Sequence, residues 1–183
     1  MKRNLITSAL AVIVFTVLLG LVYPLVITGI SQVAFGKNAD GNPDLIAKDT
    51  KGNPRLFQPR PSQSDYNAKG TFFSNRGPNQ ASARFFYRDQ LAAYIKLNGP
   101  YNPGLTNAEV PADAVTTSGS GVDPHISVDN ARFQAPRVAA ARDLPIDTVL
   151  DLLDKSTEEP SLGVLGEKVV NVLRLNLALD QLS

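Results

Sequence analysis

The hydrophobic pattern of the chain changes sharply near residue 36. Residues 4–36 carry no charged side chain, and the basic residues Lys2 and Arg3 precede them. Residues 10–30 are mostly apolar around the whole circumference of a helix, and about 20 such residues cross the hydrocarbon core of a bilayer. The pattern predicts an N-terminal membrane anchor, residues 1–36, with one transmembrane helix over about residues 10–30.

Two other kinds of segment resemble this one. A cleavable signal peptide also begins with basic residues, but its apolar region is usually about 7–15 residues long, shorter than the run seen here. The tripeptide at residues 34–36, Ala-Phe-Gly, loosely matches a cleavage site, so removal of the segment stays an alternative. A buried helix of a globular core fits less well, because such a helix is apolar along one stripe rather than on every face.

The predicted span contains residues that favour contact with other helices. Pro24 removes one backbone donor and predicts a kink. Gly20 and Gly29 allow another helix to approach closely. We therefore expect the anchor to pack against other membrane helices, with Pro24 in the surface that docks a partner.

After the anchor, residues 37–183 suffice for one domain with its own core. Three segments in this part carry helical signals. Apolar residues recur at helical spacing over residues 82–97 and stop at Asn-Gly-Pro, Ser127 can cap a helix that runs to about Arg142, and a further helix starts near Pro145. In that last helix we expect four apolar side chains to be buried, namely Ile146, Val149, Leu150 and Leu153.

Strand signals are shorter. Residues 37–80 are dense in turn-forming residues and predict loops with one short strand near residues 56–58, and a second short strand is expected around residues 114–117. Leucine alternates with other residues over residues 173–180, which is the period of a half-buried strand, with a helix as the alternative. The fold class predicted is α+β: one N-terminal transmembrane helix followed by a single mixed α/β extracytoplasmic domain, residues 37–183.

The charge balance excludes one class of partner. Removal of Lys2 and Arg3 from 18 basic residues leaves 16 against 17 acidic ones, so the domain has a formal charge near −1. A nucleic-acid-binding domain would show a basic patch or stripe, so no nucleic-acid partner is expected.

Charge alone does not orient the anchor. Lys2 and Arg3 lie before the span, but Lys37, Lys48 and Lys51 follow soon after it, so the positive-inside rule does not separate the two topologies. A very short basic N-terminus directly before the apolar run is the arrangement of an uncleaved signal anchor. We therefore expect a cytoplasmic N-terminus and a periplasmic C-terminal domain. The absence of cysteine fits either side of the membrane.

The chain offers few groups for catalysis. It has no cysteine and one histidine, His125, which excludes a thiolate nucleophile and a multi-histidine metal site. A serine hydrolase that uses His125 lacks the support of a G-x-S-x-G motif, and the Ser-Gly-Ser-Gly sequence at residues 118–121 lacks the P-loop lysine. We expect no catalytic residue and no metal site. We expect the loop at residues 116–126 to dock a partner. The residues expected to do so are Ser118, Gly119, Ser120, Gly121, Asp123 and His125.

Several blocks in the same order resemble the KdpC family, the accessory subunits of the high-affinity potassium-transporting P-type ATPase. Arg76 and Asp65 depart from the family's pattern, at positions where an apolar residue and a glycine are usual. The blocks that carry the resemblance are Tyr23-Pro24-Leu25, Phe57-Gln58-Pro59-Arg60-Pro61-Ser62, Ser74-Asn75-Arg76-Gly77-Pro78, residues 110–127, Leu165-Gly166-Glu167 and residues 170–180.

The resemblance implies an accessory, non-catalytic subunit in the bacterial inner membrane, with separate ion-conducting and ATP-hydrolysing subunits as partners. It also implies a catalytic chaperone that raises the ATP affinity of the hydrolysing subunit, with Gln134 at the position proposed to touch nucleotide. No tightly bound cofactor is expected, and ATP would act through the partner. The alternative is a free-standing, membrane-anchored envelope hydrolase or ligand-binding domain.

The nucleotide role conflicts with the expected topology. ATP is cytoplasmic, whereas a periplasmic Gln134 lies beyond a hydrocarbon core about 30 Å thick. Either the effect passes between distant sites as a coupling free energy, or one of the two assignments is wrong. On spacing alone Gln134 is an ordinary helical glutamine.

Overall fold

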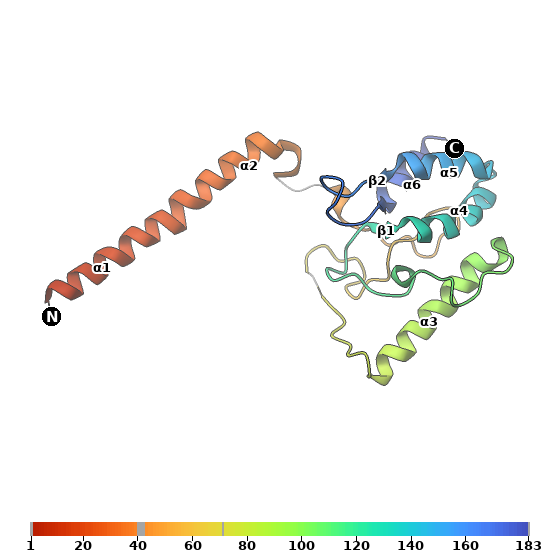
Figure 1. Cartoon of the computed structure of the whole chain (residues 1–183), viewed down its shortest axis with the longest axis horizontal. Helices are drawn as coiled ribbons and strands as arrows, with labels where there is room; N and C mark the ends of the chain where they lie inside the picture. The colour runs from red at the N-terminus through yellow and green to blue at the C-terminus, as the bar shows by residue number, and fades with distance from the viewer. Residues whose placement is uncertain (1, 40–42, 71, 183) are drawn as a thin grey trace. The chain divides into compact units, whose positions relative to one another are not determined.

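The computed structural model describes residues 2–39, 43–70 and 72–182. The chain divides into two compact units, Met1–Pro43 and Asp44–Ser183 (Figure 1). Each unit has its own construction, and the candidate site lies in the second.

The first unit is one long helical segment. It consists of α1 (Lys2–Val17), a π-helical turn η1 (Leu18–Val22) and α2 (Tyr23–Ala39). Over Lys2–Gly36 this segment is long and apolar enough to cross a membrane. Its most apolar stretch has a mean hydropathy of 2.8, and none of that stretch is buried. Among the described residues it is the one helix that meets this condition. It contains the span predicted at residues 10–30.

The π-helical turn explains how the helix accommodates Pro24. A proline lacks the amide proton that would bond four residues back, and its ring presses on the carbonyl at that position, which belongs to Gly20. Gly20 lies inside η1, where the backbone is wound more widely than in an α-helix. The structure therefore places the local adjustment in the turn before Pro24. A second irregularity occurs at Phe35, whose φ of −129° and ψ of 25° are not helical.

The second unit is an α+β domain, as predicted. A three-stranded antiparallel sheet has the order β1-β3-β2, with Ile126 opposite Val170 and Glu158 opposite Val169. In chain order the elements are η2 (Pro43–Leu45), α3 (Ala81–Asn98), η3 (Gly99–Tyr101), η4 (Ala112–Ala114), β1 (His125–Ser127), α4 (Val128–Arg142), α5 (Ile146–Lys155), β2 (Thr157–Glu158), β3 (Val169–Asn171) and α6 (Val172–Asp180).

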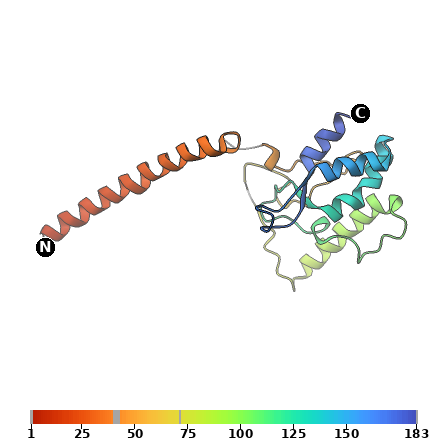
Figure 2. The same cartoon turned by 45° about the horizontal axis from the view of Figure 1, so that its top comes forward.

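The core lies where α4, α5 and α6 meet the sheet. Figures 1 and 2 show α4 and α5 side by side, with α3 along the outer side of α4. The fully buried apolar side chains of this core cluster come from β1, β3, α4, α5, α6 and the irregular segment before α3. They are Phe57, Ile126, Ala131, Ala135, Val138, Val149, Leu153, Val170, Leu175 and Leu179.

The helical predictions in this unit are confirmed. α3 covers the predicted residues 82–97 with one more residue at each end. The Ser127 hydroxyl accepts the backbone N–H of Asn130 and caps α4, which ends at Arg142 as expected. α5 begins one residue after Pro145.

The burial predicted for α5 holds for the middle of the helix. Val149 and Leu153 are fully buried, and Leu150 packs against the core. Ile146 is 38% exposed because it lies in the first turn, at the edge of the packed face, so its predicted burial is wrong.

The predicted strand at residues 173–180 is wrong, because this segment forms α6. Leu175 and Leu179 are fully buried one helical turn apart, while Leu177 on the opposite side is 52% exposed. The Asn171 side chain accepts the backbone N–H of Arg174 and starts the helix immediately after β3. The alternative helix that the sequence left open is the observed structure.

The predicted strand at residues 114–117 is also wrong. Pro111 begins a 3-10 turn there, in which its carbonyl accepts from Ala114 and the Ala112 carbonyl accepts from Val115 and Thr116. These local bonds use the backbone groups that a strand would offer to a neighbour.

Candidate functional site

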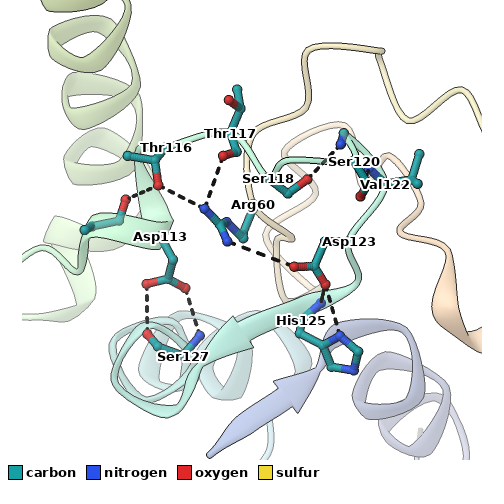
Figure 3. Close-up of polar contacts among 12 residues, drawn as sticks. Arg60, Asp113, Thr116, Thr117, Ser118, Ser120, Val122, Asp123, His125 and Ser127 are labelled. Carbon is teal, nitrogen blue, oxygen red and sulfur yellow. Dashed lines mark hydrogen bonds and ion pairs between the residues drawn. The ribbon is translucent and has the colours of Figure 1, made fainter. Parts of the chain in front are cut away.

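The loop that leads into β1 is held together by Arg60 (Figure 3). The Arg60 Nη2 atom donates to the Thr116 hydroxyl and to the Thr117 carbonyl, both at 3.2 Å. Its Nη1 atom lies 4.0 Å from an Asp123 carboxylate oxygen. The guanidinium thus joins the start of the loop to its end.

Asp123 and His125 form a compact polar pair at the end of this loop. One Asp123 oxygen accepts the backbone N–H of His125 at 3.0 Å and lies 3.0 Å from the His125 Nδ1 atom (Figure 3). The other ring nitrogen is 3.8 Å from a Glu158 oxygen on β2. His125 is half-buried, and within the described residues no hydrogen bond joins it to a serine hydroxyl. The geometry orients the imidazole between two carboxylates and holds the loop against the sheet.

The Ser-Gly-Ser-Gly segment folds back on the first part of the domain. The Gly121 carbonyl accepts from the hydroxyls of Ser62 at 2.5 Å and Ser64 at 3.3 Å, and the Gly121 N–H donates to the Ser118 hydroxyl at 3.0 Å. Gly121 has a φ of +76°, and a Cβ there would lie 2.7 Å from the Ser64 oxygen. Only a glycine fits this position.

The expected docking residues therefore separate into two groups. Ser118 and Gly121 are buried within the domain, whereas Ser120, Asp123 and His125 are half-buried and Gly119 is exposed. Five of these six residues of the domain lie in the loop before β1, and His125 is the first residue of β1. Pro24, the seventh, belongs to the first unit.

Asp113 is an organising residue that sequence reasoning missed. Its carboxylate accepts the Ser127 N–H at 2.8 Å, the Ser127 hydroxyl at 2.9 Å and the Asn130 side-chain amide at 3.0 Å. It therefore supports the cap of α4 from 14 residues upstream. Its position in a Pro-Ala-Asp-Ala turn gave no sign of this contact.

Gln134 is almost fully buried, with 1% of its surface exposed. Its oxygen accepts the Gln58 N–H at 2.7 Å and an Arg137 N–H at 2.9 Å. Its nitrogen donates to the Gln58 carbonyl at 3.1 Å and to the Asn130 oxygen at 3.0 Å. All four bonds lie within the domain, so the side chain acts as a cross-link between α4 and residues 57–58.

Asn176 of α6 makes the same pair of bonds with the preceding residue. Its oxygen accepts the Phe57 N–H at 2.8 Å, and its nitrogen donates to the Phe57 carbonyl at 3.0 Å. The strand predicted near residues 56–58 is therefore wrong. Two side-chain amides, from Gln134 and Asn176, satisfy the backbone groups that a neighbouring strand would otherwise satisfy.

Arg137 is a buried cation in the same region. Its guanidinium donates to the Asn98 side-chain oxygen at 2.9 Å, to Gln134, and to backbone carbonyls that include Pro54 at 2.5 Å and Leu56 at 3.0 Å. Burial lowers the pKa of Arg137 to about 10, because desolvation penalises the charged form. The carbonyl oxygens compensate part of this cost.

A hollow of about 260 Å³ lies beside Gln134. Its walls include Asp49, Thr50, Tyr66, Tyr94 and Gln90. No lysine or arginine is among the described residues that line it, so the hollow lacks the cationic side chains that pair with a triphosphate. These residues do not fit ATP as a ligand held by this chain alone.

The chain has one long apolar helix and a small α+β domain, and the polar loop of this domain bonds mainly to other parts of the same domain. These features define a class: a membrane protein with a single candidate span and one attached domain. Comparison with known proteins goes further. Residues 5–181 match the family described as the K+-transporting ATPase, c chain. The chain belongs to this family, the KdpC subunits of potassium-transporting ATPases.

Relatives from three bacteria are similar over most of their length. Each carries the description potassium-transporting ATPase KdpC subunit. The protein of Mycobacterium tuberculosis H37Rv is 43% identical over the whole of both chains. That of Caulobacter vibrioides is 43% identical over 91% of this chain and 87% of its own. That of Cereibacter sphaeroides is 40% identical over 98% of each chain.

Proposed function

We propose that this chain is an accessory, non-catalytic subunit of an ATP-driven, high-affinity potassium uptake complex in the bacterial inner membrane. Its partners would be separate ion-conducting and ATP-hydrolysing subunits. The observation that carries the proposal is the family match over residues 5–181. One apolar span is too little to enclose a pore, which supports a role beside the conducting subunit.

The half-buried edge of the loop, with Ser120, Asp123 and His125, supplies the docking surface of the domain. Its groups are held in place by Arg60 and by β2, so a partner meets a surface that is already ordered. Such pre-organisation lowers the entropic cost of association. The exposed backbone at Gly119 allows close approach.

The domain lies on the periplasmic side in this proposal, with the N-terminus in the cytoplasm. Lys2 and Arg3 directly before the span support this orientation, as in an uncleaved signal anchor. A catalytic-chaperone effect on ATP affinity then has to be indirect. The four hydrogen bonds that Gln134 makes inside the domain support the indirect route, because they occupy both ends of the amide.

Copurification tests the proposed function. The tagged full-length chain is co-expressed with the ion-conducting and ATP-hydrolysing subunits and extracted in mild detergent. Mass measurement of the intact complex should then find it with one copy of each larger subunit. Omission of the chain should abolish potassium-dependent ATPase activity. A stable lone monomer, with ATPase activity unaffected by its omission, would instead indicate a free-standing envelope hydrolase or ligand-binding domain.

Thiol labelling tests the orientation. The chain has no cysteine, so a single Asn107→Cys substitution on the exposed loop after α3 gives one reactive group. A membrane-impermeant reagent should label it on intact spheroplasts. Labelling only after the membrane is breached would place the domain in the cytoplasm and make direct contact between Gln134 and nucleotide the better explanation.

A further inference from the structure

The connection between β2 and β3 is an ordered hairpin with an apolar tip. Ser161 and Leu165 pair across it, with N···O distances of 3.0 Å and 2.9 Å in the two directions. Three large apolar side chains project from the tip into open space: Leu162 is 89% exposed, Val164 80% and Leu165 61%. Their exposure is unlike that of the other branched aliphatic side chains in the strands and helices of this domain, most of which are buried or partly buried.

The backbone of the tip makes the leucine at its apex unexpected. The Val164 N–H donates to the Ser161 carbonyl, and the two residues between them have positive φ, +56° for Leu162 and +75° for Gly163. Two positive φ values define a type I′ turn, whose first central position favours Asn, Asp or Gly. Leu162 is thus disfavoured both by its backbone conformation and by its exposure to water, which indicates that an apolar contact outside the domain uses it.

The neck of the hairpin is charged, but most of its charges are paired. Glu159 lies 2.8 Å from Lys168 across the two arms. Glu158 receives a hydrogen bond of 2.8 Å from Arg174. Glu167, on the returning arm, is exposed and makes no ion pair within the described residues. The result is an apolar tip on a charged neck whose ion pairs lie below the tip, which suits a segment whose tip alone enters an apolar medium.

The hairpin lies at the end of the domain where the chain enters it. Arg174, which binds Glu158 at the neck, also contacts the Asp44 carboxylate at 3.3 Å. The Asn171 amide at the end of β3 donates to the Asp44 carbonyl at 2.8 Å. Figures 1 and 2 both show the loop between β2 and β3 beside η2, which contains Asp44.

The length of chain before Asp44 limits how far this end of the domain can be from the membrane. The uncharged run ends at Gly36, and eight residues later the chain reaches Asp44. Eight residues span at most about 28 Å when fully extended, and less here because part of the stretch is helical. Leu162 at the tip is four residues beyond Glu158, so the hairpin extends about 13 Å from its neck.

We propose that the hairpin tip, Leu162 with Val164 and Leu165, is a second membrane contact that inserts into the lipid interface of the bilayer spanned by the N-terminal helix. Its occupant is lipid, at the boundary between headgroups and acyl chains, where short apolar and amphipathic elements gain most from burial. Together with the transmembrane helix it attaches the domain at two points. The domain then has a fixed orientation on the membrane, which a single flexible tether would not provide.

Lipid-borne quenchers test this contact. The cysteine-free chain takes a single Leu162→Cys substitution labelled with an environment-sensitive fluorophore, and the full-length protein is placed in lipid nanodiscs. Lipids with nitroxide groups near the headgroup should quench this label strongly. The matched control is Asn107→Cys on the exposed loop after α3, and its label should show background quenching. Figures 1 and 2 show the C-terminal end of α3 on the opposite side of the domain from the loop between β2 and β3. Equal quenching at the two positions would overturn the proposal.

A second measurement separates lipid from protein as the occupant. When the same labelled chain is assembled with its partner subunits in nanodiscs, lipid quenching at position 162 should persist. Its loss in the complex, together with protection of the label from aqueous iodide, would show that a partner protein covers the tip and would overturn the proposal.

A third variant guards against misfolding. Leu162→Asn combined with Leu165→Asn removes the apolar tip, while asparagine suits the left-handed position of the turn. With the label moved to Val164→Cys, this background should lose most of the lipid quenching and keep the thermal stability of the parent domain. Quenching that stays at the parent level would contradict insertion of the tip.

Discussion

Replacement of Gln134 by methionine isolates what its amide contributes. Methionine keeps the volume of the side chain nearly constant, so no cavity forms in the core. The change removes four hydrogen bonds, two to the Gln58 backbone and one each to Asn130 and Arg137. It leaves the Gln58 backbone groups and one guanidinium N–H without these partners.

The expected cost follows from these bonds. Each is worth about 0.5–1.5 kcal/mol net, so four of them give about 2–6 kcal/mol. Gln58 is half-buried, and water can replace part of the loss there. We therefore expect Gln134→Met to lower the free energy of unfolding of the domain by about 3 kcal/mol, a large part of the roughly 5–15 kcal/mol that stabilises a typical domain.

Urea unfolding of the purified full-length chain in detergent measures this loss. Gln90 offers a matched control, because it lines the same hollow and its side chain makes no hydrogen bond within the described residues. Gln90→Met should change the free energy of unfolding by less than about 0.5 kcal/mol. Equal destabilisation by the two substitutions would refute the role assigned to the Gln134 amide.

The same variant distinguishes the two routes to ATP affinity. Asn176→Leu removes the other amide that binds residues 57–58 and should destabilise the domain similarly. If coupling is indirect, both variants should raise the KM for ATP of the assembled complex in proportion to their loss of stability. A raised KM for Gln134→Met alone, with unchanged stability, would refute indirect coupling and indicate direct contact with nucleotide.

Three further outcomes are expected. Gly121→Ala should destabilise the domain by about 1–3 kcal/mol in thermal unfolding, because of its positive φ and the close Ser64 oxygen, whereas Gly119→Ala, with open space around it, should be nearly neutral. Burial and then nearby carboxylates raise the pKa of Tyr66 from 10.0 to about 12. Its contribution to stability is therefore complete below about pH 10 and is lost toward pH 12, and tyrosinate absorbance and unfolding midpoints should show this loss together. His125→Ala should weaken assembly at most, and a fully assembled complex without turnover would contradict a docking role.

Local signals in the sequence predicted three helices of this domain, α3, α4 and α5. The Asn-Gly-Pro sequence that begins at the last residue of α3 and the Ser127 cap of α4 act within a few residues of the element they delimit. The capping serine is recognisable because its hydroxyl serves a backbone N–H three residues later. A few consecutive residues are therefore enough to predict where such a helix begins or ends.

The contacts that shape the candidate site are not local. Residues 57–58 are bound by amides that lie 76 and 119 positions away, and no periodicity in the sequence records this pairing. A short strand was predicted there, but the structure has no strand at these residues. Asp113 escaped notice for the same reason, since its partners Ser127 and Asn130 follow 14 and 17 residues later.

The leucine alternation in α6 shows a different limit. Leucines at every second position place two of them, Leu175 and Leu179, four residues apart, which is also the spacing of one helical face. The pattern therefore fits a strand and a helix equally, and the choice depends on what surrounds it. β3 already has partners on both sides, β1 and β2, and the Asn171 cap turns the chain into a helix directly after it.

The loop at residues 116–126 resembles a binding site in sequence because tight backbone packing and ligand binding need the same small and polar residues. In the structure most of their hydrogen-bonding capacity is used within the domain: Gly121 accepts from two serines, and Asp123 holds His125. A partner can therefore contact only what remains accessible, which is the backbone around Gly119 and the edge where His125 meets Glu158. Substitutions at this edge should act on assembly, whereas those at Gly121 should act first on folding.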